Sequence, residues 1–165
     1  MQDVCLEQRV QESEEFTPEV TRISHSPTAD TIAAGYANGS IRIWDTSNTE
    51  CVAVLQSHSG SISALAFNSK GGLIASGSQD TDIIVWDVAG EVGLYKLKAH
   101  TNQVTAVVFL DTQNKLLSAG KDGFVRVWDL AVQFCIQVVP IHSGNKSVLH
   151  AAMQQGSADA YVYIA

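Results

Sequence analysis

The chain has 165 residues, of which 45% are hydrophobic and only 16% are charged, a composition that excludes a disordered or low-complexity protein. No apolar run reaches the roughly 18 residues that a membrane helix needs, and no basic stretch followed by an apolar one opens the chain, so neither a membrane segment nor a secretory signal is expected. The net charge is −7, so we expect the chain to be a poor direct partner for a phosphate backbone.

The first predicted element is an acidic lead over residues 1–19, which holds six acidic residues against the single Arg9. The run Glu12–Glu19 is typical of a solvated linker, and a docking site for a basic partner is the alternative. The remainder of the chain, 20–165, is much closer to neutral.

From residue 20 onward the sequence repeats at a step of 42 residues. Four residue classes share this step, and each tryptophan is followed by aspartate. Such a period, with histidine early and Trp-Asp late, is the signature of a WD-repeat propeller blade. The recurring sets are Trp44, Trp86 and Trp128; His58, His100 and His142; Ala34, Ser76 and Ser118; and Asn38, Asp80 and Asp122.

The period places four strands in each blade. Short β-branched and aromatic runs end at each Trp-Asp, and each follows a turn pair such as Asn38-Gly39 or Asp122-Gly123. The expected strands lie near 20–25, 31–36, 40–45 and 51–56, then near 61–67, 72–77, 82–87 and 93–98, and then near 103–109, 115–120, 124–129 and 134–139. Two more are expected over Ser147–Met153 and Ala160–Ile164.

The sequence therefore predicts an all-β fold, an incomplete WD-repeat β-propeller of about three and a half four-stranded blades. The expected blades are 20–56, 57–98, 99–140 and a partial one over 141–165, and residues 1–19 could instead be the end of a preceding blade. Because closed propellers usually have four to eight blades, we expect this to be a piece of a longer chain. Phe16 stands where a histidine would begin the first blade.

His58, Ser76 and Asp80 together resemble a hydrolytic triad, but His100, Ser118 and Asp122 repeat the same set in the next blade. Active sites do not recur in every blade, so we interpret these residues as buried structural networks. In this interpretation the indole N–H groups of Trp86 and Trp128 are the terminal donors. Asn38, Trp44 and His142 are the corresponding residues elsewhere in the repeat, and Ala34 weakens the network of the first blade.

No catalytic residue, metal site, cofactor or small-molecule substrate is expected. The leading histidines belong to different blades, and the three cysteines have no zinc-ligand spacing, which favours free thiols. What remains for function is the rim, where propellers bind partners. Candidates by position alone are Tyr36, Gln79, Lys121, Thr101, Asn102 and Gln103.

A narrower resemblance lies in Asp80–Val88, Gly93–Leu97, His100 and Phe109-Leu110, and in Gly35-Tyr36 and Gly39–Ile43 of the first blade. These segments resemble the WD-repeat subunit of the UtpB subcomplex of the small-subunit processome. That resemblance implies a nucleolar, non-enzymatic scaffold with two propellers and a helical tail. It implies a role in early small-subunit ribosomal RNA maturation, with other WD-repeat processome subunits and the box C/D snoRNP as partners. Association with RNA would then be mediated by partner proteins.

The main alternative is a different WD-repeat adaptor, such as a substrate receptor of a ubiquitin ligase. Such receptors often carry arginine two residues after Trp-Asp, and Ser47, Ala89 and Ala131 stand there instead. A hydrolase built on a propeller would need polar side chains around the central channel. The inner strands begin with Val20, Ile62 and Val104, which disfavours it.

Overall fold

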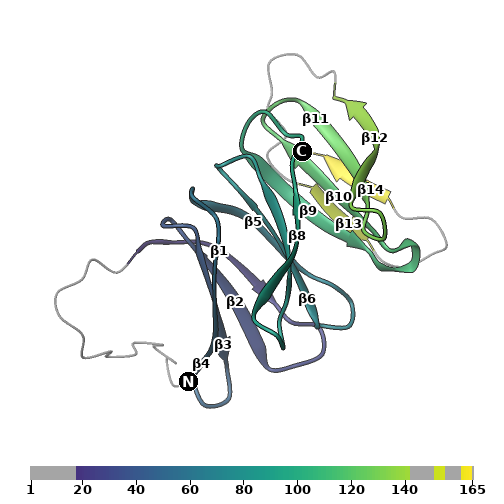
Figure 1. Cartoon of the computed structure of the whole chain (residues 1–165). Coiled ribbons are helices and arrows are strands. Elements are labelled where there is room, and N and C mark those ends of the chain that lie inside the picture. Colours follow the sequence, from purple (N-terminus) through teal and green to yellow (C-terminus); the bar gives the residue numbers. More distant parts are fainter. Residues whose placement is uncertain (1–17, 142–150, 155–160, 165) are drawn as a thin grey trace.

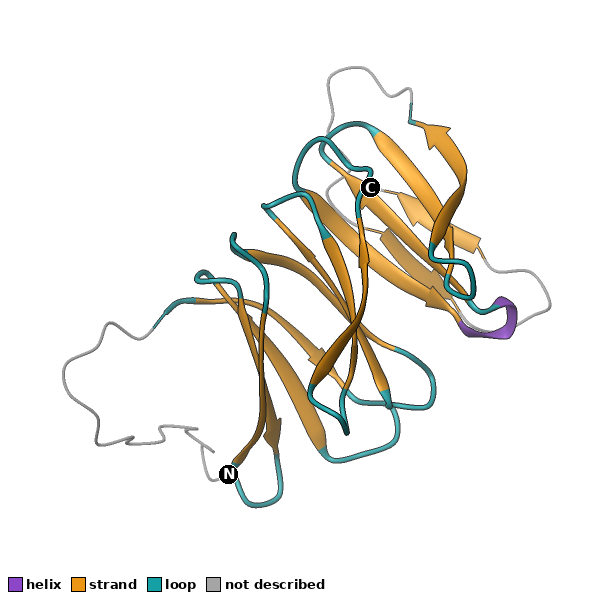
Figure 2. Cartoon of the chain, in the orientation of Figure 1, coloured by secondary structure: helices purple, strands orange, loops and turns teal. Residues whose placement is uncertain are grey.

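The structure is a computed structural model that describes residues 18–141, 151–154 and 161–164, and these residues form almost entirely antiparallel β-sheet (Figures 1 and 2). The strands pair in chain order within three four-stranded sheets and one two-stranded sheet. The only helix among the described residues is a single 3-10 turn, η1 (Asp111–Gln113). The expected all-β class, an open and incomplete propeller of four-stranded blades, is confirmed.

The first sheet contains β1 (Val20–His25), β2 (Thr31–Tyr36), β3 (Ser40–Asp45) and β4 (Cys51–Gln56). The second contains β5 (Ile62–Phe67), β6 (Leu73–Ser78), β7 (Ile83–Asp87) and β8 (Val92–Leu97). The third contains β9 (Val104–Leu110), β10 (Lys115–Gly120), β11 (Phe124–Asp129) and β12 (Phe134–Pro140). The two-stranded sheet pairs β13 (Ala151–Gln154) with β14 (Tyr161–Ile164). We refer to these sheets as blades one to four.

Each of the twelve strands in blades one to three begins and ends within one residue of the position that the 42-residue period predicts. The fourth blade differs, because the strand expected over Ser147–Met153 is described only from Ala151 onward. The period works because the third strand, the turn before it and the following aspartate recur at fixed spacing. These features set the antiparallel register of their neighbours.

The blades stand side by side, with their first strands β1, β5 and β9 in contact (Figure 1). The antiparallel order sorts the connections to two ends. One end, here called the network end, carries the loops 37–39, 57–61, 79–82, 98–103 and 121–123. The other end, here called the acidic end, carries the loops 26–30, 46–50, 68–72, 88–91, 111–114 and 130–133.

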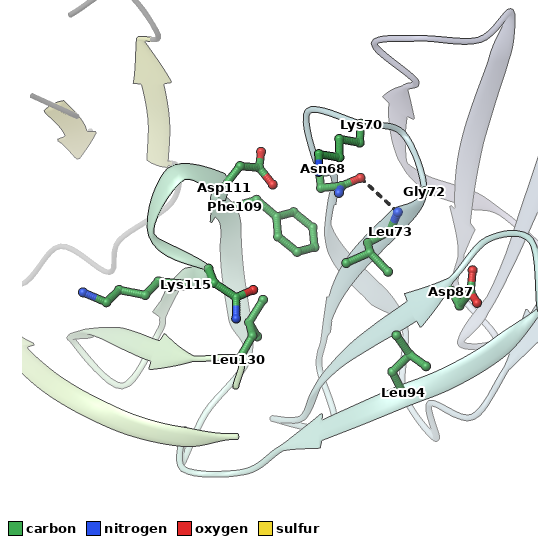
Figure 3. A pocket seen from close by; sticks show the side chains of 11 residues that line it. Asn68, Lys70, Gly72, Leu73, Asp87, Leu94, Phe109, Asp111, Lys115 and Leu130 are labelled. Atoms are coloured by element: carbon green, nitrogen blue, oxygen red, sulfur yellow. Dashed lines mark hydrogen bonds between the residues drawn. The ribbon is translucent and has the colours of Figure 1, made fainter. Parts of the chain in front are cut away.

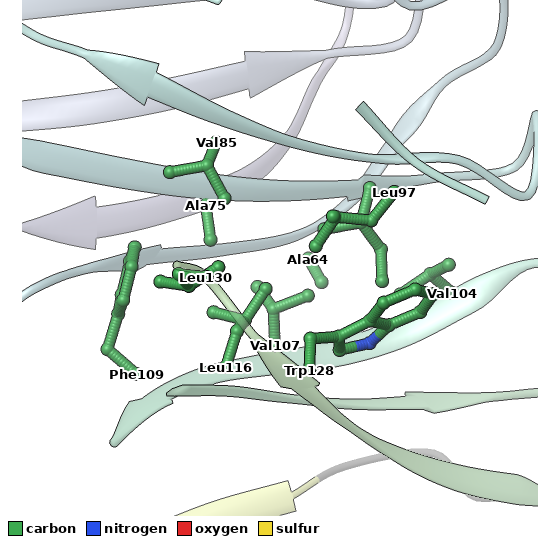
Figure 4. Close-up of a cluster of buried hydrophobic side chains, with 11 residues drawn as sticks. Ala64, Ala75, Val85, Leu97, Val104, Val107, Phe109, Leu116, Trp128 and Leu130 are labelled. Atoms are coloured by element: carbon green, nitrogen blue, oxygen red, sulfur yellow. The ribbon is translucent and has the colours of Figure 1, made fainter. Parts of the chain in front are cut away.

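The hydrophobic core lies between adjacent blades rather than within one (Figure 4). Between blades two and three, Ala75, Val85 and Leu97 pack against Val104, Leu116 and Trp128, all of them buried. A similar cluster joins blades one and two. Because each fully buried aliphatic side chain stabilises by about 1.5–3 kcal/mol, the blades depend on one another for stability.

Two further features of the repeat bring the blades close together. Gly35 and Gly77 face the first strand of the next blade, and a Cβ at Gly77 would lie 2.5 Å from Val104 Cγ1. The hydroxyl of Thr21 donates to the Ile62 carbonyl at 2.6 Å, and that of Ser63 donates to the Val104 carbonyl at 2.5 Å. Both pairs recur at the 42-residue step, so sequence comparison of the blades could have found them.

Candidate functional site

The polar network of blade two joins four side chains from two strands, β6 and β7, and two loops. His58, in the loop before the blade, lies with Nδ1 3.0 Å from Asp80 Oδ2 and with Nε2 2.8 Å from Ser76 Oγ. The indole N–H of Trp86 donates to Ser76 Oγ, also at 2.8 Å. The backbone N–H of Ser59 donates to Asp80 at 2.9 Å, which ties the loop to the turn. Each polar group therefore has a partner.

The pKa shifts indicate which group donates each hydrogen bond of the network. Burial lowers the pKa of His58, and the nearby Asp80 carboxylate opposes this only in part. Burial disfavours ionisation of Asp80, yet hydrogen bonds from the Ser59 N–H and His58 hold its pKa below the usual value. At neutral pH the contact is thus a hydrogen bond from a neutral imidazole to a carboxylate, not an ion pair. Nδ1 carries the proton, and the Ser76 hydroxyl donates to Nε2.

Blade three repeats this arrangement and adds an arginine. His100 Nδ1 lies 2.9 Å from Asp122 Oδ2, and Nε2 lies 2.8 Å from the hydroxyl of Ser118, which also accepts from Trp128 at 2.9 Å. Arg126 donates to Asp122 Oδ2 at 2.9 Å, and its Nη1 lies 3.0 Å from His100 Nδ1.

Burial and neighbouring charges shift the pKa values of both His100 and Asp122 in blade three. Burial lowers the pKa of His100, and the positive charge of Arg126 lowers it further, against the opposing effect of Asp122. Burial again disfavours ionisation of Asp122, while bonds from His100 and the Thr101 N–H hold its pKa low. Sequence reasoning missed Arg126, although Arg42 at the same position in blade one was a signal; blade two has Ile84 there.

Blade one has no such network among its described residues. Ala34 offers no hydroxyl to Trp44, and Asn38 instead accepts bonds from the backbone and hydroxyl of Ser40. Arg42 corresponds to Arg126, and its guanidinium lies 5.4 Å from the centre of the Tyr36 ring. His142 lies outside the described residues, so its expected role stays a prediction.

The networks offer no route for a substrate. Ser76 and Ser118 have no exposed surface, and each hydroxyl is held between an indole and an imidazole. A nucleophile needs open space beside its oxygen for an attacked carbonyl. We therefore interpret both sets as structural, holding the loop before each blade to its central hairpin. Among the described residues no three potential metal ligands converge, and no helix is long and apolar enough to cross a membrane.

The rim candidates do not all reach the surface. Gln79, Lys121, Thr101 and Asn102 are exposed at the network end, and Gln103 is half-buried there. The expectation that Tyr36 lies on the rim is wrong. Its side chain is buried, at 8% exposed, and its ring contacts Arg42. The cause is position in the repeat, since Tyr36 ends β2 as Ser78 ends β6, and both are directed into the blades.

Charge is distributed unevenly between the two ends, a feature that the nearly neutral total of residues 20–165 does not reveal. At the network end and in the strand halves near it, basic side chains outnumber acidic ones: Arg22, Arg42, Lys96, Lys98, Lys121 and Arg126 against Glu19, Asp80, Asp82 and Asp122. At the acidic end the balance reverses: Asp30, Asp45, Glu50, Asp87, Glu91, Asp111 and Asp129 against Lys70 and Lys115. These sets include only described residues.

Comparison with known proteins gives a family and a fold. Residues 2–161 match the family model of the WDR3 first beta-propeller domain, which confirms the resemblance to a processome WD-repeat subunit. The solved structure of U3-55K is similar, with a TM-score of 0.72 and 22% identity over 77% of this chain and 41% of that chain. The chain thus spans less than half of that structure. Because 1338 solved chains match, such likeness indicates fold alone. No curated protein matches.

Proposed function

This chain belongs to the WDR3 first beta-propeller domain family, and from that membership we propose that it is part of a non-catalytic scaffold in small-subunit ribosomal RNA maturation. The scaffold would assemble protein and snoRNP partners within the small-subunit processome, in the nucleolus. The family match over residues 2–161 is the observation that carries this proposal.

The geometry supports a scaffold. The groups that resemble catalysts are buried and hydrogen-bonded to one another, so they stabilise blades instead of meeting substrates. Interlocked blades hold two sets of loops at fixed positions, which is what a rigid docking platform requires. We propose that Gln79, Lys121, Thr101 and Asn102 contact protein partners at the network end. We also propose that association with RNA is mediated by those partners.

The experiment uses the full-length protein that contains this chain, tagged in cells from which the untagged protein can be depleted. Purification should recover WD-repeat processome subunits and the box C/D particle, and the protein partners should remain after ribonuclease treatment. Depletion should lower mature small-subunit RNA and raise its precursors, with little effect on large-subunit RNA. Normal precursor processing, or purification with a ubiquitin ligase core, would overturn the assignment.

A matched pair of surface variants tests the proposed contacts. Lys121→Glu with Thr101→Arg changes two exposed side chains at the network end, so it should reduce recovery of partners without unfolding the blades. Val52→Arg, at the exposed beginning of β4 and therefore near the opposite end of the blades, is the control and should leave recovery unchanged. Equal recovery with both would show that this part of the rim does not bind partners.

A further inference from the structure

A groove opens between blades two and three at the acidic end (Figure 3). It encloses about 490 Å³, within the range of roughly 300–1,000 Å³ that is usual for binding pockets. The side chains of Phe109, Leu73 and Leu130 come together at its centre, from β9, β6 and the turn after β11 (Figure 3). Leu94 of β8 adds an aliphatic side chain that is 42% exposed. The groove thus has an apolar floor.

The walls of the groove are fixed before any ligand binds. Asn68 Oδ1 accepts from the Leu73 N–H at 2.9 Å, which closes one loop on itself (Figure 3). The Ser69 N–H donates to Asp111 Oδ2 at 2.8 Å, which joins that loop to η1 of the next blade. Asn114 ends η1 in the left-handed conformation, with a φ of 51°. A preformed groove loses little entropy when a ligand enters.

The rim of the groove carries two carboxylates and two ammonium groups. Asp87 and Asp111 line it, whereas Lys115 extends away and donates to Gln113 at 3.1 Å (Figure 3). Lys70 is the other cation on the rim. The surrounding acidic end adds the carboxylates of neighbouring loops, so its field attracts positive charge.

We propose that this groove docks a basic segment of a partner protein, with one large apolar side chain of that segment in the cavity. Lysine or arginine side chains on either side of the anchor would lie against Asp87, Asp111 and the acidic end. The apolar floor supplies the affinity of a buried anchor, and the acidic end around the groove supplies charge complementarity. The inference goes beyond the ribosomal role proposed above and stands whether or not that role is correct.

The test is a fluorescence anisotropy titration of the whole chain with a labelled synthetic peptide. The peptide carries one central leucine flanked on both sides by lysine and arginine. We expect saturable binding that weakens with salt, and about a tenfold rise in Kd when the leucine becomes alanine. A peptide with glutamate in place of the basic residues should not bind. Failure of the basic peptide to bind, or equal binding of the alanine peptide, would overturn the proposal.

Two arginine substitutions separate the groove from general charge attraction. Leu94 and Val52 occupy the same bulged position of the outer strand in blades two and one, and both are exposed, at 42% and 48%. Leu94→Arg should raise Kd at least about tenfold, whereas Val52→Arg, with the same added charge, should change it less than about twofold. Equal changes in Kd would show that peptide binding depends only on the net charge of the chain. Far-UV circular dichroism checks that both variants fold.

Discussion

Arg126 in the third strand of blade three donates to Asp122 in the turn before that strand, at 2.9 Å. The same position in blade two is Ile84, which is 2% exposed and packs in the core between blades one and two. One structural site therefore accepts either a buried guanidinium or an aliphatic side chain. This comparison within a single chain allows the contribution of the ion pair to be measured.

We expect Arg126→Ile to be well tolerated. Asp122 would keep its bonds from His100 and the Thr101 N–H, which are the bonds that Asp80 makes in blade two. Replacement of a buried ion pair by packed aliphatic atoms is often nearly neutral. The free energy of unfolding in urea should change by less than about 1 kcal/mol. A loss of several kcal/mol would show that the pair itself stabilises blade three.

Asp122→Ala should be far more destabilising than Arg126→Ile. It leaves the Arg126 guanidinium, with a side chain only 10% exposed, and the His100 Nδ1–H without their acceptor. We expect a loss on the order of 3 kcal/mol, the range found when one partner of a buried pair is removed. Asp80→Ala, where no arginine is stranded, is the matched control and should cost less. Equal losses would contradict a role for Arg126.

Ser76→Ala should lower the free energy of unfolding by about 1–3 kcal/mol, because it strands the Trp86 N–H and His58 Nε2 inside the blade. Ser59→Ala is the control: its hydroxyl is exposed and only 3.5 Å from Asp80, so the change should stay within about 0.5 kcal/mol. If Ser76→Ala left stability intact but removed a hydrolytic activity of the full-length protein, the network would be catalytic.

Stability should fall as the pH drops from about 7.5 to about 5. The pKa values of His58 and His100 are lowered from 6.5 in the folded chain, so below that pH the unfolded chain binds protons that the folded chain does not. The lowered pKa values of Asp80 and Asp122 act in the same direction, in a window below 3.8. Stabilisation from all four groups is thus complete at neutral pH.

Urea unfolding across this range measures the effect, with His100→Gln for comparison. The variant lacks one titrating group, so its loss of stability between about pH 7.5 and about pH 5 should be smaller. NMR titration of the imidazoles in the wild-type chain gives an independent readout if the variant is too unstable. His58 and His100 resonances that titrate above pH 6.5 would contradict the proposed neutral networks.

The repeat predicts much of this architecture from sequence. Trp44, Trp86 and Trp128 fix the third strands, and the partners of each network follow from the shared step of 42 residues. When two blades are aligned with an error of one residue, however, the exposure of a side chain is predicted wrongly. Tyr36 aligns with Ser78, whereas Ala37 aligns with the exposed Gln79, and a shift of one residue in a strand reverses the face.

Two features are missed when the repeat is interpreted one blade at a time. The acidic end forms because antiparallel order brings alternate loops together, so Asp45, Asp87 and Asp129 share one end although they are far apart in sequence. The groove lies where the glycine-containing turn 68–72 of blade two meets η1 of blade three. Gly71, in that turn, fits against Thr28 so closely that a Cβ would lie 2.3 Å from its hydroxyl oxygen.

Close approach of blades two and three gives the last prediction, Gly77→Ala. Gly77 is buried in β6, and an added Cβ would lie 2.5 Å from Val104 Cγ1 and 2.9 Å from Val104 Cβ. Val104 belongs to the first strand of the next blade and is itself fully buried, so the blades must separate locally to accept the methyl group. We expect a loss of about 1–3 kcal/mol in urea unfolding, as for other overpacked cores. Gly72→Ala is the control, because a Cβ there meets nothing within 4 Å, and it should be neutral or slightly stabilising. If Gly77→Ala matched that control, the contact between β6 and β9 would be looser than the structure indicates. Interlocked packing would then not be what holds the loops of blades two and three in register.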